Sequence, residues 1–164
     1  MGEWHIAHVA DDDLASLDVV RELFSEYHEW LGAAVCSIRL AEEIANLPGP
    51  YAAPSGRLYL ATGPSGVAAG CIGVRPHSGS ACEIKRLYVR PEARGSGLGS
   101  ALVSAGIATA RELGYTEALV TTLPDSMPVA AAMYERLGFE RVQPFLDHSH
   151  VDEAVEMLYL RLTL

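Results

Sequence analysis

The clearest chemical feature of the chain is a glycine-rich loop, Arg-Gly-Ser-Gly-Leu-Gly, at residues 94–99. It follows a β-like run at residues 83–89 and leads into an Ala- and Leu-rich helical run at residues 98–113. Glycines let a backbone approach a ligand closely and adopt conformations that a Cβ would forbid. The helix that follows points its unsatisfied N–H groups and the positive end of its dipole at the loop. The loop is therefore predicted to bind an anion, with phosphate the best-suited one.

Two common phosphate-binding patterns do not fit this loop. Counted from Gly95, the G-x-G-x-x-G fingerprint of dinucleotide-binding folds puts Ser100 where the last glycine belongs. That fingerprint also normally opens its fold and has an acidic residue roughly 20 positions downstream. The Gly-Lys-Ser/Thr ending of a Walker-type loop is absent as well. Taken alone, the loop is also compatible with a purely structural role as a glycine turn that binds no ligand.

The elements around the loop predict an α/β fold. The order β-α-α-β-β-β-α-β-α-β-β describes a mixed sheet of six or seven strands with about four helices on both faces. The central β-α-β unit at residues 82–122 implies parallel strands joined by a right-handed crossover. The strands are expected at residues 4–9, 57–62, 67–74, 82–89, 116–122, from 138 onward and at 154–162, and the helices from 11–13 to 31 and at 39–47, 98–113 and 129–137.

Length and composition limit the classes of function. The 164 residues, 49% of them hydrophobic, fit a single domain spanning residues 1–164. A net charge of −9 argues against nucleic acid as a partner and favours a cationic or amine substrate.

No apolar run is long enough to span a bilayer, and the N-terminus does not have the pattern of a signal peptide. We therefore expect no membrane association and a cytoplasmic location. The three cysteines (Cys36, Cys71 and Cys82) lack metal-ligand spacing and are expected to be buried thiols.

Two motifs together give the chain a family resemblance. The run at residues 84–99 closely resembles the acetyl-CoA-binding motif of the GNAT superfamily of N-acetyltransferases, Q/R-x-x-G-x-G/A, with Arg94, Gly97 and Gly99 at the specified positions. One strand later, residues 134–139 (Tyr-Glu-Arg-Leu-Gly-Phe) resemble the superfamily's Y-x-x-x-G-F segment. The resemblance covers residues 57–139 strongly and the rest of the chain by topology only. Two motifs in the right order around the right elements form a specific pattern.

The resemblance implies a fold whose two central parallel strands splay apart, with acetyl-CoA as acyl donor and no metal. Pantetheine would lie between these strands as a pseudo-strand, and a strand N–H at about Leu87 would stabilise the oxyanion. The side chain of Arg94 would be an optional second contact to the pyrophosphate. The implied cofactor-binding residues are Leu87, Tyr88 and Val89 on the strand, and Arg94, Gly95, Ser96, Gly97, Leu98, Gly99 and Ser100 in the loop.

Two catalytic candidates follow from the resemblance. Tyr134 occupies the position where the superfamily often uses a tyrosine as general acid, and its ordinary pKa of about 10 suits proton transfer to a thiolate. The alternative is a tyrosine that only packs on the cofactor. Glu83 lies 11 residues before Arg94, the spacing of the catalytic glutamate in the histone-acetylating branch. An acid on a central strand is costly unless it is paired or functional, so Glu83 could be a base, an anchor for the substrate ammonium, or an ion pair with Lys85 or Arg86.

The sequence departs from the superfamily at one position. Many members carry an asparagine seven residues before the tyrosine, where this chain has Met127. Any contact from that asparagine to pantetheine is lost, and Ser126 is the expected replacement as helix N-cap.

The acceptor side is expected at the first two helices and the last loop. Tyr27, His28 and Trp30 end the first helix and are substrate candidates, although aromatic residues at this spacing are also typical of a core. His148 and His150 in the loop at residues 144–152 lack metal spacing, and solvated side chains are the simplest interpretation.

The sequence therefore predicts an N-acetyltransferase that moves an acetyl group directly to an amine of a small molecule, amino acid or peptide. Exposed strand edges and the habit of the family favour a homodimer. One alternative is a non-catalytic acyl-CoA-binding or sensor domain. Another is a different acyl donor, such as succinyl- or malonyl-CoA, for which Arg75 and Arg86 could supply a positive charge.

Overall fold

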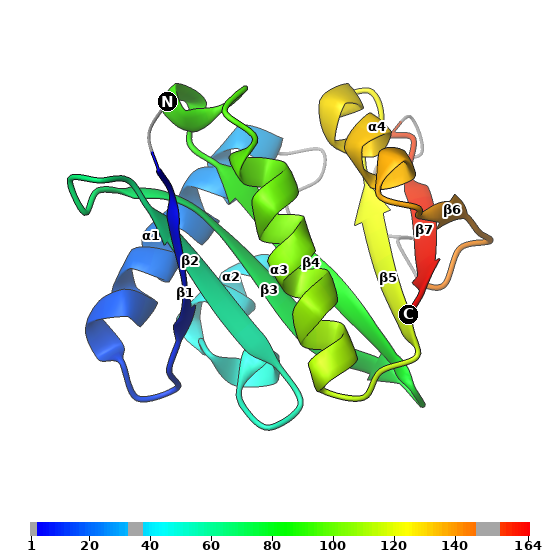
Figure 1. Cartoon of the computed structure of the whole chain (residues 1–164), viewed down its shortest axis with the longest axis horizontal. Helices are drawn as coiled ribbons and strands as arrows, with labels where there is room; N and C mark the ends of the chain where they lie inside the picture. Colours follow the sequence, from blue (N-terminus) through cyan, green and yellow to red (C-terminus); the bar gives the residue numbers. More distant parts are fainter. Residues whose placement is uncertain (1–2, 33–37, 147–154) are drawn as a thin grey trace.

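The computed structural model describes residues 3–32, 38–146 and 155–164, which form one seven-stranded sheet with the order β1-β2-β3-β4-β5-β7-β6 (Figure 1). The strands are β1 (His5–Val9), β2 (Arg57–Thr62), β3 (Ala68–Ser78), β4 (Ala81–Val89), β5 (Glu117–Thr122), β6 (Glu140–Arg141) and β7 (Leu158–Thr163). The helices are α1 (Leu14–Leu31), α2 (Ile38–Ala45), α3 (Leu98–Glu112) and α4 (Pro128–Arg136), with single 3-10 turns η1 (Gly49–Tyr51) and η2 (Pro91–Ala93). None of the helices in these ranges is long and apolar enough to cross a membrane.

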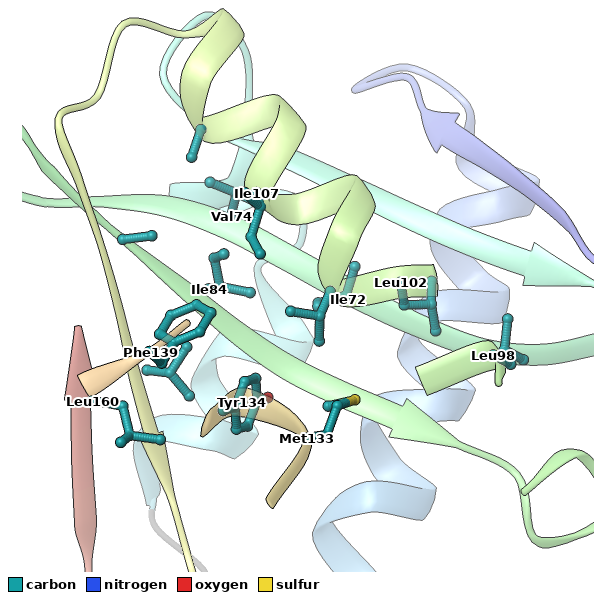
Figure 2. Packing of buried hydrophobic residues seen from close by; sticks show 14 of the residues in the cluster. Ile72, Val74, Ile84, Leu98, Leu102, Ile107, Met133, Tyr134, Phe139 and Leu160 are labelled. Atoms are coloured by element: carbon teal, nitrogen blue, oxygen red, sulfur yellow. The ribbon is translucent and has the colours of Figure 1, made fainter. Parts of the chain in front are cut away.

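Helices cover both faces of the sheet, so the core has two parts. On one face, buried residues of α3 and α4, such as Leu102 and Met133, pack with Ile72 of β3 and Ile84 of β4 (Figure 2). On the other face, α1 and α2 pack with η1 against a second cluster that includes Tyr88 of β4. The predicted mixed α/β fold is confirmed.

The central parallel strands β4 and β5 separate soon after they begin. They pair only through three residues each, 81–83 with 117–119. Beyond Glu83, β4 remains paired with β3 up to Val89, and β5 remains paired with β7 up to Thr122. The predicted splay is therefore present, and beyond this point no strand of the described residues pairs with the facing edges of β4 and β5.

A β-bulge at Arg86 changes which face the side chains of β4 point to. Arg86 has a φ of 62°, and the register with β3 shifts between Cys71 and Gly73, so that two residues of β4 lie opposite one of β3. Lys85 and Arg86 therefore both face α1 and α2, whereas Leu87 and Val89 pack toward α3 and α4. A side chain other than glycine in this backbone region is uncommon and often marks a functional site.

Several predicted boundaries were wrong. The strand expected at residues 67–74 continues through Ser78, because the β3–β4 ladder extends across residues that read locally as a turn. This extension places Arg75 directly opposite Glu83. The last strand begins at Leu158, since the described residues 155–157 are not extended, and the strand after Gly138 has only two residues. The second helix ends at Ala45, before the turn at η1.

Gly70 provides a test of the close approach between β3 and β4. A Cβ at Gly70 would lie 2.6 Å from the backbone oxygen of Tyr88, which the ladder holds in place. We therefore expect Gly70→Ala to lower the free energy of unfolding by about 1–3 kcal/mol, as overpacking does elsewhere. Gly63→Ala is the matched control, because its Cβ would meet no atom closer than 3.5 Å. Urea unfolding of both variants measures the difference, and equal stabilities would contradict the described approach.

Candidate active site

The glycine loop has the geometry of an anion cradle. Gly95 and Gly97 have φ values of 75° and 85°, a region that suits glycine, and Gly97 is the N-cap of α3. No side chain caps this helix, whose first interior hydrogen bond runs from the Ala101 N–H to the Gly97 oxygen at 3.1 Å. The N–H groups of the first turn are thus directed at an exposed loop, where an anion can accept them.

Arg94 joins the loop to the end of α1. Its Nε donates a hydrogen bond to the Val89 oxygen at 2.9 Å. Its guanidinium lies 5.2 Å from the ring centre of Trp30 and 5.9 Å from that of Tyr88, both within cation–π range. Trp30 is 43% exposed, so this contact lies at the surface beside the loop rather than in the core.

An ion pair fixes the end of β4 against α1. Arg90 donates to both carboxylate oxygens of Glu26, with the shortest distance 2.7 Å, and to the Ala68 oxygen at 2.9 Å. The hydrogen bond from Arg90 lowers the pKa of Glu26. The loop therefore starts from a strand end that both β3 and α1 hold in place.

Tyr27 lies deeper along the same helix. Its ring is 6.3 Å from that of Trp30 and 6.0 Å from that of Tyr88. Burial raises the pKa of the Tyr27 phenol, and the nearby Arg86 guanidinium opposes that shift. His28 is half-buried in the last turn of the same helix. The predicted substrate residues Tyr27 and Trp30 thus adjoin β4 and the glycine loop.

Tyr134 faces the gap from the opposite side of the sheet. It is 5% exposed on α4, its ring stands edge-on to Phe139 at 5.5 Å, and Figure 2 shows it beside Met133 close to β4. Burial raises the pKa of Tyr134, and the Tyr27 phenol raises it further. These two tyrosines influence each other although α1 and α4 cover different faces of the sheet.

The wall of the gap beside α4 is apolar. Leu87 and Val89 of β4 are half-buried and pack into the same cluster as Tyr134. Gly99 in the first turn of α3 lies close to both Val89 and the sulfur of Met133, since a Cβ there would be 3.9 Å from each. The predicted cofactor residues of the strand and of the loop therefore come together along one edge of the gap.

Glu83 lies in a buried ion pair. It is 1% exposed, and its Oε1 accepts hydrogen bonds from Arg75 Nε at 3.1 Å, with Arg75 Nη2 at 3.0 Å. Its Oε2 makes no hydrogen bond to the described residues, although Lys85 Nζ lies 3.5 Å away. Lys85, one of the two expected partners, is therefore close to Glu83, two residues along the same strand.

The ion pair belongs to a larger cluster that includes Glu43. Glu43 of α2 accepts from Arg75 Nη1 at 3.2 Å and from Arg86 Nε at 2.7 Å. Arg86, the other expected partner of Glu83, is therefore paired with α2 instead. No sequence motif indicated Glu43, because its contact depends on how α2 packs across β3 and β4. We call Glu43, Arg75, Glu83, Lys85 and Arg86 the ion cluster.

Some expectations concern residues elsewhere. His148 and His150 lie outside the described residues. The N-cap of α4 is Met127 with no side-chain hydrogen bond, so the expectation of Ser126 was wrong. Helix α4 therefore begins one residue later than a cap at Ser126 would place it, with Pro128 as the first helical residue.

Within the described ranges, no group of three or more His, Cys, Asp or Glu side chains could hold a metal ion.

A separate cavity lies at the paired end of β4 and β5. It has a volume of about 800 Å³, and its walls include His77, Phe145 and Arg161. The ring of Phe145 is edge-on to both His77 and Tyr159. None of the predicted site residues lines this cavity, which distinguishes it from the gap beside the glycine loop.

Comparisons with known proteins agree on the family. Residues 17–139 match the model of the acetyltransferase (GNAT) family. The chain is 36% identical to the uncharacterized N-acetyltransferase C1271.07c of Schizosaccharomyces pombe, over 90% of this chain and 88% of that protein. It is 33% identical to the uncharacterized N-acetyltransferase YjgM of Escherichia coli, with the same coverage of 90% and 88%.

Solved structures share the fold at low sequence identity. An acetyltransferase of the GNAT family from Staphylococcus aureus superposes with a TM-score of 0.77 at 17% identity, covering 98% of this chain and 99% of that one. The structure of yncA from Salmonella typhimurium, solved with its cofactor acetyl-CoA, gives a TM-score of 0.68 at 20% identity, covering 98% and 93%.

Gly97→Val tests the loop as the anion site. Valine at a φ of 85° costs about 1–2 kcal/mol of strain, and relief of that strain would turn the first N–H groups of α3 away. We expect CoA binding, measured by calorimetry, to weaken at least about tenfold. Gly66→Val is the matched control, because Gly66 has a φ of 79° with equally free space but lies in the β2–β3 turn. Equal CoA affinity of the two variants would contradict this assignment.

Proposed function

The chain belongs to the GNAT family of acetyltransferases, and on that premise we propose that it transfers an acetyl group from acetyl-CoA directly to a primary amine. The acceptor is a small molecule, an amino acid or a peptide. The observation that carries the proposal is the gap between β4 and β5, which has an uncapped helix start at its mouth and a buried tyrosine on its wall. Free buried thiols at Cys71 and Cys82 are in keeping with work in a reducing cytoplasm.

In this reaction the chain holds the donor mainly by its backbone. N–H groups at residues 94–100 bind the pyrophosphate, and the free edge of β4 at Leu87 and Val89 hydrogen-bonds the pantetheine amides. The Leu87 N–H stabilises the oxyanion that forms on the thioester carbonyl. Strand β4 can do this because β5 no longer occupies its edge beyond Glu83.

Tyr134 supplies a proton to the departing thiolate. Burial and the neighbouring Tyr27 both raise the pKa of its phenol, so that it stays protonated across the neutral range. A protonated phenol can give its proton to the forming thiolate, although the thiol that results is the stronger acid of the two in water. The transfer is completed when the tyrosinate takes up a proton from the acceptor nitrogen. Buried and facing the gap, Tyr134 donates without competition from bulk water.

The charges near the gap favour acetyl over an acyl group with a terminal carboxylate. Such a donor needs an unpaired cation, and Arg75 and Arg86 were the candidates. Both guanidiniums are paired with Glu43, and Arg75 also with Glu83. A succinyl or malonyl carboxylate would have to displace one of these carboxylates.

A thiol-release assay with acetyl-CoA and a panel of amines tests the proposal. We expect release that depends on at least one amine, and we expect Tyr134→Phe to lower kcat by about 10²-fold with little change in the KM for acetyl-CoA. Binding of CoA without turnover on any amine would instead support a non-catalytic acyl-CoA sensor.

Tyr115→Phe is the control for this substitution. The Tyr115 hydroxyl donates to the Ser55 oxygen at 2.6 Å, at the end of α3 away from the glycine loop. Its loss costs stability of about 1 kcal/mol but should leave kcat unchanged. A Tyr134→Phe enzyme as active as Tyr115→Phe would remove Tyr134 from the proposed mechanism.

A further inference from the structure

The ion cluster contains one group that can change its charge near neutral pH. Its members are two carboxylates, two guanidiniums and the amine of Lys85, the only lysine of the chain. Guanidiniums stay protonated in proteins, and the two carboxylates each lie against arginines. When Lys85 is neutral, the other four charges cancel. When it is protonated, the cluster carries an excess positive charge in a mostly buried place.

Along β4, Lys85 comes between the buried Glu83 and the stretch that is no longer paired with β5, and its side chain is the more exposed of the two. Glu83 is 1% exposed and its Oε1 is held by Arg75, whereas the side chain of Lys85 is 17% exposed. Lys85 is two residues from Leu87, just beyond the last pair of β4 with β5. Lys85 lies on the face of α1 and α2, and the bulge at Arg86 turns Leu87 and Val89 to the opposite face, where Tyr134 lies. An amine that enters from this face reaches Lys85 before it reaches Glu83.

We infer that Lys85 is the base that takes the proton from the acceptor ammonium, with Glu83 and Arg75 as the residues that position it. The inference rests on the proposed transfer reaction and deepens it. Glu83, the base expected from its spacing, acts through Lys85: its Oε2 lies 3.5 Å from Nζ without a hydrogen bond to the described residues, and can accept one once Nζ is protonated.

The proton and electron balance of the step is complete. The acceptor ammonium gives one proton to the neutral Nζ, and the freed lone pair forms the C–N bond to the thioester carbon. The C–S bond breaks, the CoA thiolate takes the Tyr134 proton, and the second proton of the nitrogen returns to the tyrosinate. Lys85 then releases its proton to solvent at its exposed side.

The electrostatic surroundings support this role. Loss of hydration, followed by the charge of Arg86, lowers the pKa of Lys85 to about 8, against the effects of Glu83 and Glu43. The groups that face it are Glu83 and Arg86 of β4, Arg75 of β3 and Glu43 of α2, and the phenols of Tyr27 and Tyr51 adjoin Arg86. At pH 7.5 roughly one quarter of such an amine is neutral, against roughly one in a thousand for an ordinary lysine.

The single lysine allows a direct measurement on the whole chain. Protein labelled with [13Cε]lysine gives one side-chain signal, whose titration we expect to have a midpoint near 8. A midpoint above about 10, as for a solvated lysine, overturns the inference whatever the enzyme's activity.

The kinetic test uses two variants that cannot accept the proton and differ in charge. Lys85→Arg keeps the positive charge, and Lys85→Gln removes it. With the acceptor found for the wild type, we expect both to lower kcat at least about 10²-fold with the KM for acetyl-CoA unchanged, and to abolish the ascending limb near pH 8 in the kcat profile. Thermal unfolding checks that each variant is folded. If only one of the two variants folds, that variant alone is enough for the test.

Two outcomes overturn the base and spare the proposed function. One is a Lys85→Arg enzyme with the rate and pH profile of the wild type. The other is a change confined to the KM of the acceptor, which would make Lys85 a binding residue only. An inactive wild type on every amine overturns the transfer reaction itself, and the inference with it.

Discussion

The site depends on the separation of β4 from β5, which is maintained because each strand is hydrogen-bonded to a different neighbour on its outer edge. β5 is paired with β7 over all six of its residues, and β4 is paired with β3 as far as its last residue. Neither strand can move across to close the gap without breaking a ladder. Backbone groups on the inner edges therefore need another partner, and buried backbone groups are nearly always satisfied. A ligand with amides of its own, such as pantetheine, meets that need.

The two sides of the gap have different character, which assigns them different roles. Toward α3 and α4 the wall consists of Leu87, Val89, Met133 and Tyr134. Toward α1 and α2 the ion cluster lies against the same strand, and the bulge at Arg86 causes the change of side. Buried charges are costly unless they are paired, and a buried cluster with an unbalanced net charge is costlier still. The ion cluster, whose net charge changes when Lys85 gains or loses a proton, therefore fits a site of proton transfer. Its excess positive charge contrasts with the net charge of −9 of the whole chain.

Most of the fold, and the backbone geometry of the glycine loop, could be predicted from the sequence. Periodicity and glycine spacing placed β4, α3 and the loop between them, and the motif around Tyr134 placed α4 beside the same gap. The ion cluster could not be predicted in this way. Arg75 lies just beyond the strand expected at residues 67–74, yet the ladder carries it to Glu83. Glu43 meets Arg86 only because α2 packs there. These contacts join residues far apart in the chain, and no local pattern encodes them.

Amide hydrogen exchange with and without acetyl-CoA tests the central claim most directly. If the donor lies in the gap, the amides at residues 87–89 and 95–100 become protected, because a ligand then occupies the free edge of β4 and the start of α3. The amides at residues 81–83, already paired with β5, change little. Protection around the separate cavity, at residues 77–81 and 141–145, with none along residues 87–100, would contradict the account.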